Sequence, residues 1–201
     1  MAFQWIIDTA TEIKLDSHAV VAQTRARDGS VKAVRRGAQP WTFTVTSPDG
    51  PKFSEVRKYL AEINYSDRHS PNRINFNHTG HEYMFEYQGD RLANYGSVVA
   101  NVQQGSDIIE LTNVPSGSGN MVVAGDYIQL GPNGVYMAVE TTVSNSFKVH
   151  RPVIENLTTS SINVGVGCNF LVRCVQFPQY RIFGYDQVAW DGPFVFVEEI
   201  L

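Results

Sequence analysis

Apolar and polar residues alternate along many short stretches of this chain, the pattern of half-buried β-strands. In the clearest stretch, Trp41–Thr46, the residues Trp41, Phe43 and Val45 share one face and threonines take the other. The same pattern predicts further strands at Phe3–Ile7, Glu12–Leu15, His81–Gln88, Asp107–Thr112, Tyr127–Leu130, Val135–Glu140, Phe147–Val153, Ile162–Val166, Asn169–Gln176 and Gly192–Leu201. The chain is therefore predicted to be mainly β.

One segment has helical spacing instead. Phe53, Val56, Leu60 and Ile63 fall at i, i+3, i+7 and i+10, which places them on one face of a helix. A proline and an aspartate just before them fit a helix start. We expect a helix over residues 52–63, packed on the sheet.

The two ends of the chain look like parts of one sheet, and a different kind of sequence separates them. From Val98 onward small residues, valine, asparagine and glycine dominate short strands and turns. This predicts a discontinuous β-sandwich domain, residues 1–97 and 177–201, with one packed α-helix. A small β-barrel is predicted as an insert over residues 98–176, and the last strand closes the first domain.

Composition narrows the class of protein. Of 201 residues 43% are apolar and 18% charged, enough for a packed core. The net charge of −4 does not support a general affinity for nucleic acid. The start of the chain lacks the pattern of a signal peptide, and no run reaches the roughly 18 apolar residues of a membrane span. We therefore expect folding in the cytosol and no contact with a membrane.

Both cysteines fall on one face of one predicted strand. Cys168 and Cys174 lie six residues apart, so an extended backbone holds them about 20 Å from each other, beyond disulfide reach. Buried thiols are expected. A bridge between two chains of an oligomer is the alternative.

No catalytic or metal-binding motif emerges. His78, His81 and Glu82 lack the helical His-Glu-x-x-His spacing and are expected to be polar loop residues. Ser118 between two glycines lacks the strand-to-helix setting of a hydrolase nucleophile. Paired carboxylates for glycoside cleavage have no local pattern to test. We predict no catalytic residue, no cofactor and no metal.

Charge is distributed unevenly between the two ends. Residues 25–36 carry five bases against one acid and no aromatic residue, so base stacking is not implied. After Arg181 every charged residue is acidic. One hypothesis is that these segments pair between copies of the chain in a ring. The predicted subunit contacts are Arg25, Arg27, Arg35, Arg36, Glu198 and Glu199.

Three stretches together resemble a known family. The first is Arg35–Val45, which reads RRGAQPWTFTV and precedes the predicted helix. The second is GDYIQL at Gly125–Leu130 with the strands after it, and the third is the ending GPFVFVEE at Gly192–Glu199. Spread over nearly the whole chain, these stretches resemble the distal tail proteins of tailed bacteriophages.

The resemblance implies a structural virion protein of the tail tip or baseplate and no enzymatic activity. It implies a β-sandwich ring domain, forming a hexamer around the DNA channel, and a peripheral barrel of the oligonucleotide/oligosaccharide-binding type. The expected partners are five further copies, the tail tube protein, and hub or baseplate proteins of a contractile or non-contractile tail. DNA would pass without specific binding, and Asp186 and Asp191 are the candidate lumen-facing residues.

Two other functions remain open. A carbohydrate-binding module that attaches a phage tail to its host would need several tryptophans or tyrosines on one exposed face. The three tryptophans, Trp5, Trp41 and Trp190, lie in predicted core or closing segments. A small hydrolase has no motif in its favour.

Overall fold

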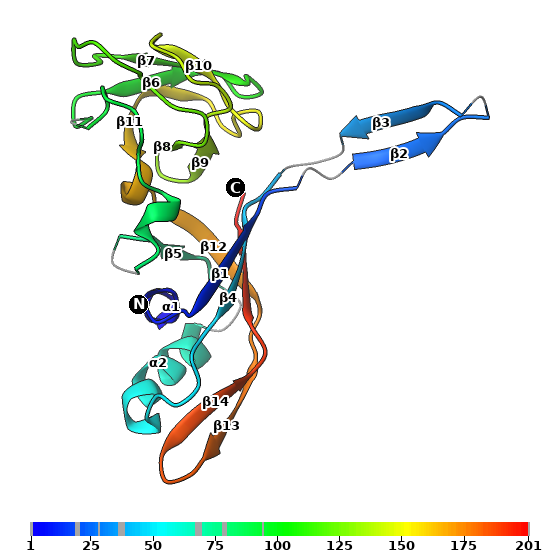
Figure 1. Cartoon of the computed structure of the whole chain (residues 1–201), viewed down its shortest axis with the longest axis vertical. Coiled ribbons are helices and arrows are strands. Elements are labelled where there is room, and N and C mark those ends of the chain that lie inside the picture. Colours follow the sequence, from blue (N-terminus) through cyan, green and yellow to red (C-terminus); the bar gives the residue numbers. More distant parts are fainter. Residues whose placement is uncertain are drawn as a thin grey trace.

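The chain forms two β-structured bodies, one built on a curled sheet and the other a small barrel (Figure 1). The computed structural model describes residues 2–18, 21–27, 29–35, 39–66, 70–77, 80–93 and 95–200. About 42% of the described residues are in strands and 14% are helical, so the predicted mainly β fold with a packed helix is confirmed.

The helices are α1 (Ala2–Asp8) and α2 (Phe53–Ser66), with the short 3₁₀ turns η2 (Glu82–Met84) and η3 (Gly165–Gly167). The strands are β1 (Glu12–Asp16), β2 (Val21–Arg25), β3 (Val31–Arg35), β4 (Thr42–Thr46), β5 (Asn72–Ile74), β6 (Val99–Val102), β7 (Ile108–Thr112), β8 (Tyr127–Leu130), β9 (Gly134–Met137), β10 (Ser146–Lys148), β11 (Leu157–Val164), β12 (Phe170–Gln176), β13 (Gln179–Phe183), β14 (Gln187–Asp191) and β15 (Phe194–Glu198).

The sheet body is built on an antiparallel sheet in the order β1-β4-β15-β12-β5. Strand β15 lies between β4 and β12, so the C-terminal strand belongs to the same sheet as the N-terminal strands and occupies its centre. Aromatic side chains cover the buried face, and Phe43, Phe170 and Phe196 are fully buried. Burial of one such ring stabilises the fold by roughly 2–3 kcal/mol.

Both helices pack with this sheet body, on one side of it in Figure 1. Helix α2 confirms the predicted apolar face, since Val56 and Leu60 are buried. The predicted strand at Phe3–Ile7 is wrong, because these residues form most of α1. Phe3, Ile6 and Ile7 are buried at helical spacing, and the Phe3 ring meets Phe196 edge-on at 5.2 Å.

The second body, the inserted barrel, has the strand order β10-β7-β6-β11-β8-β9. Its two edges meet just beyond β9 and β10, where Ala138 bridges to Val149. There the Val139 N–H donates to the Lys148 carbonyl at 3.0 Å. Closure leaves few unpaired edge groups and encloses a second core that includes Ile109, Ile128 and Phe147.

Two sequence-based assignments need correction. The predicted insert ends too late, because β12 pairs with β15 and β5 in the sheet body and only the strands through β11 belong to the barrel. The predicted strand over 81–88 is wrong as well, since η2 begins there. Phe85 is buried at 1% exposure, whereas Tyr83 is 70% exposed, so the aromatic residues do not share one face.

Candidate assembly surfaces

The basic segment of the sequence forms a hairpin that leaves the body, shown at the upper right of Figure 1. Strands β2 and β3 pair from Val21↔Arg35 to Arg25↔Val31, beyond the point where the β1–β4 pair ends at Asp16↔Thr42. The hairpin is thus the outer half of a long, interrupted β-ribbon. We call residues 21–35 the basic arm.

Among the described residues, β2 and β3 pair with each other and with no other strand. The arm leaves apolar residues in water, with Val21 42% and Val31 62% exposed. Arg25 and Arg27 are also exposed. Arg35 contributes its backbone to β3, and Arg36 lies outside the described residues. A two-stranded ribbon is marginally stable alone, so this arm is suited to a partner surface.

The structure removes Glu198 from the predicted set of subunit contacts. Its side chain is 0% exposed and accepts two hydrogen bonds from Arg151, Nη1 to Oε2 and Nη2 to Oε1, each 2.6 Å long. Glu198 shares the buried face of β15 with Phe194 and Phe196, so it points away from solvent and toward Arg151. The Glu198 carboxylate is therefore not available to the basic arm of another copy.

Around this ion pair the sheet body and the barrel are joined by a set of buried polar contacts, the junction. The Trp41 N–H donates to Glu198 Oε2 at 3.0 Å, and the Trp41 indole donates to the Val135 carbonyl at 2.9 Å. Arg151 also donates to the carbonyls of Gln39 and Val135. The junction therefore pairs polar groups of the sheet body with polar groups of the barrel.

Glu199 lies at the surface but has a partner within the chain. Its carboxylate accepts from Arg173 Nη2 and Nε, both at 2.8 Å. The hydrogen bonds from Arg173 lower the pKa of Glu199 below its ordinary value. The side chain keeps 25% exposure, so contact with a second copy would compete with Arg173.

The candidate lumen residues Asp186 and Asp191 lie on the β13–β14 hairpin. Asp186 accepts a hydrogen bond from the Ser54 hydroxyl at 3.1 Å, which ties the hairpin to α2. Asp191 is exposed. The same hairpin exposes large apolar side chains: Tyr180, Ile182, Phe183 and Tyr185.

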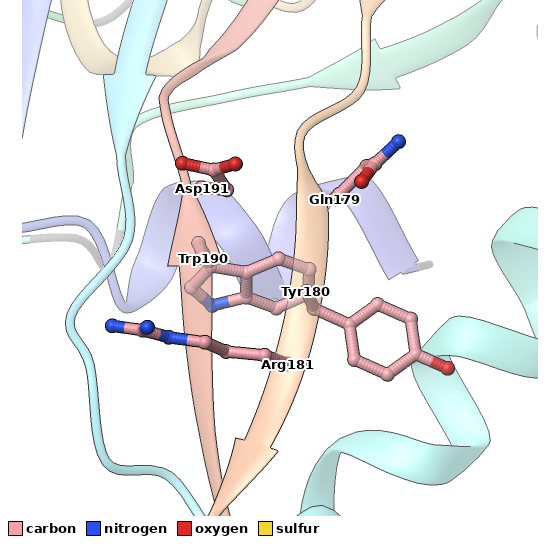
Figure 2. Close-up of a pocket in the computed structure, with 5 residues that line it drawn as sticks. All are labelled: Gln179, Tyr180, Arg181, Trp190 and Asp191. Atoms are coloured by element: carbon pink, nitrogen blue, oxygen red, sulfur yellow. The ribbon is translucent and has the colours of Figure 1, made fainter.

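A small pocket of about 220 Å³ lies at the base of this hairpin (Figure 2). Gln179, Tyr180 and Arg181 line it from β13, and Trp190 and Asp191 from β14. The rings of Tyr180 and Trp190 meet edge-on at 5.8 Å. Trp190 is half-buried against Phe194, whereas Trp41 is buried in the core.

The histidines and cysteines are the remaining candidates for metal binding or thiol chemistry. His81 Nε2 lies 3.2 Å from the Ala10 carbonyl, and His78 falls outside the described residues. Within the described ranges no three His, Cys, Asp or Glu side chains gather as a metal site. Both cysteines are buried thiols outside any disulfide, as predicted; burial raises the pKa of the Cys168 thiol far above its ordinary value.

The sequence reading missed one surface, on the outside of the barrel. Ile108 and Val139 flank Lys148 from opposite sides, because Ile108 pairs with Lys148 and Val139 donates to the Lys148 carbonyl. Ile108 is 52% and Val139 43% exposed. Two exposed carboxylates are close to this row: Glu110 follows Ile108 by two residues in β7, and Glu140 directly follows Val139. The sequence held one sign of this surface: in an alternating strand, Ile108 and Ile109 must lie on opposite faces, so one of them is exposed.

Among the described residues, neither helix has the length and apolar character needed to cross a bilayer. A scan against protein-family models and a search of curated proteins found no match to this chain.

Proposed function

We propose that this chain is a structural ring protein of a bacteriophage tail, of the distal tail kind. Six copies would join the tail tube to the tail tip or baseplate and surround the DNA channel. The protein would have no catalytic role. Its partners would be its own copies, the tube protein above, and hub or baseplate proteins below.

The observation that carries the proposal is the basic arm, which extends from the sheet body and whose described side chains are mostly exposed. Isolated ribbons of this kind expose backbone edges that favour pairing or docking with another chain. A surface on one copy that fits a different surface on the next copy generates rings when the rotation closes. The sheet body with its inserted barrel agrees with the architecture that the family resemblance implies.

The β13–β14 hairpin carries two acids, Asp186 and Asp191, and one base, Arg181, and this small excess of negative charge supports a channel that does not retain DNA. The phosphates of the DNA backbone are attracted by lysine and arginine side chains and repelled by carboxylates. If the β13–β14 hairpin lines the lumen, its acids would let the genome slide through.

The test is the mass of the purified protein by light scattering, with negative-stain images of the same sample. Six copies of the 22.4 kDa chain give a particle of about 130 kDa with sixfold symmetry. The same measurement is repeated after addition of tail tube protein, because assembly can depend on a template. A monomer in both samples would contradict the ring proposal.

A second candidate function has one observation in its favour. The pocket in Figure 2 combines the aromatic surface of Trp190 and Tyr180 with the polar side chains Gln179, Arg181 and Asp191. Aromatic rings bordered by hydrogen-bonding groups suit a saccharide. In this alternative the protein attaches a phage tail to host glycans. A glycan array with the wild type and Trp190→Ala tests it, and binding that survives the substitution excludes this pocket.

A further inference from the structure

The basic arm carries apolar and positively charged side chains on the same face. The strand register places Val21, Gln23 and Arg25 on one face, with Val31 directly opposite Arg25. Residues 21–35 contain four bases, Arg25, Arg27, Lys32 and Arg35, and one acid, Asp28, for a formal charge of +3. Its natural partner is therefore an acidic surface that also exposes apolar side chains.

The outer face of the inserted barrel has this composition. Ile108, Lys148 and Val139 form a row across β7, β10 and the segment after β9. Around the row stand the acids Asp107, Glu110 and Glu140, and with Lys148 they give a formal charge of −2. We call these six residues the outer barrel face.

The charges of this face are only partly satisfied within the chain. Lys148 Nζ lies 3.3 Å from Asp107 Oδ2, so these two charges offset each other. Glu140 accepts the Lys148 backbone N–H at 2.9 Å and keeps its negative charge. Glu110 takes part in no ion pair among the described residues. Two carboxylates next to exposed Ile108 and Val139 thus remain for an outside partner.

The arm does not serve its own barrel. In Figure 1 it extends sideways from the body, at about the level of the barrel along the long axis. Copies placed side by side with parallel long axes would bring the arm of one against the barrel of the next. At about 3.3 Å per residue, the arm is roughly 20 Å long from Val21 to its turn, enough to cross a small barrel.

We infer that the basic arm of one copy docks on the outer barrel face of a neighbouring copy. Val21 and Val31 pack against Ile108 and Val139, and Arg25, which lies on the same face of the arm, pairs with Glu110 and Glu140. The inference rests on the proposed ring, and it identifies the surface that receives the arm. It also replaces the C-terminal acids as the partner, since Glu198 is buried at the junction.

A charge exchange tests the contact. Arg25→Glu with Arg27→Glu should raise the dissociation constant of assembly at least about tenfold, because like charges then face each other. Glu110→Arg should weaken assembly in the same direction. Both changes in one chain should restore most of the affinity. The control is Arg57→Glu with Lys58→Glu on α2, which reverses two exposed charges and should leave assembly unchanged.

A covalent readout locates the contact without relying on charge. A Val31→Cys variant mixed with an Ile108→Cys variant should form a disulfide-linked pair of chains under mild oxidation. Neither variant should form that pair with Tyr185→Cys, although Tyr185 on the β13–β14 hairpin is more exposed than Val31 or Ile108. The native cysteines are buried and do not compete.

The outcomes separate this inference from the ring proposal. If the wild type assembles while the arm variant assembles equally well and the 31–108 pair does not form, the inference is overturned and the ring stands. If the wild type stays monomeric with and without tube protein, the ring proposal fails. In that case a specific 31–108 disulfide at high protein concentration would still support the contact, and its absence would overturn it.

Discussion

The Arg151 guanidinium and the Glu198 carboxylate meet where water does not reach, with 2% and 0% of their side chains exposed. Removing both charges from water costs several kcal/mol per ion, and the pair offsets this only through close, well-formed hydrogen bonds. Here both carboxylate oxygens accept from Arg151, and one of them also accepts the Trp41 N–H. The pair is therefore costly to break and specifies how the two bodies meet.

Replacing Glu198 with glutamine should lower the free energy of unfolding by about 3 kcal/mol or more, because Arg151 keeps a buried, uncompensated charge. Urea denaturation measures the change. The matched control is Glu199→Gln, whose partner Arg173 is partly exposed and can be hydrated. If both substitutions lower the free energy of unfolding equally, burial of the Arg151–Glu198 pair does not make it more important for stability than the exposed pair. Arg151→Met combined with Glu198→Leu should recover much of the stability.

Tyr127 makes the protein sensitive to alkali. Burial, and to a lesser degree the nearby Cys168, raises the pKa of its phenol from 10.0 to about 12. A raised folded-state pKa contributes stability that is fully present below pH 10 and is lost as the pH rises toward 12, because the unfolded chain releases the proton first. The free energy of unfolding should fall less between pH 9 and pH 11.5 in Tyr127→Phe than in the wild type. Identical losses would contradict this assignment.

At the scale of elements, the pattern of apolar residues alone does not distinguish a helix from a strand in short apolar segments. Phe3–Ile7 contains too few residues to separate a helical from an extended period, and contacts with β5 and α2 select the helix. The ring of Trp5 stacks on Tyr59 of α2 at 4.7 Å. Trp41–Thr46 lacked this ambiguity, because its alternation is strict and its apolar face is fully buried.

The chain returns from the barrel to the sheet through a narrow place at Gly165. Its φ is +59°, and a Cβ there would lie 2.8 Å from the Phe85 carbonyl oxygen and 2.9 Å from the Tyr87 nitrogen. Gly165→Ala should therefore cost about 1–3 kcal/mol through backbone strain and the clash. Thermal denaturation measures it. Gly96→Ala is the control, since nothing lies within 4 Å of its added Cβ, and it should have little effect.

At the scale of the whole molecule, the two cores share the junction. Tyr127 and Val135 come from barrel strands but pack in the core of the sheet body, with Trp41 and Phe170. The barrel is thus fastened to the sheet by apolar contacts as well as by the Arg151–Glu198 pair. This arrangement holds the outer barrel face at a defined position relative to the sheet body.

We expect the wild type to unfold in one transition. The three tryptophans, Trp5, Trp41 and Trp190, all belong to the sheet body, so their fluorescence follows that body, whereas calorimetry follows both. The two midpoints should coincide in the wild type. In Glu198→Gln the two bodies should unfold separately. Calorimetry should then show two transitions, and the fluorescence midpoint should match the lower one, with the barrel unfolding at the higher temperature. Two separate transitions in the wild type would show that the junction does not couple the cores.

The sequence by itself determined the mainly β class, the strand at Trp41–Thr46, helix α2 and the strands near residues 127–130 and 135–140. These follow from local period and turn chemistry, which need no distant partner. Only the tertiary structure decided that β12 belongs to the sheet body, that Glu198 is buried and that residues 81–88 do not form a strand. Each of these depends on contacts between residues far apart in the chain, such as Glu198 with Arg151 and Phe85 with Gly165. A linear pattern records which side chains are apolar or charged, but not which of them meet.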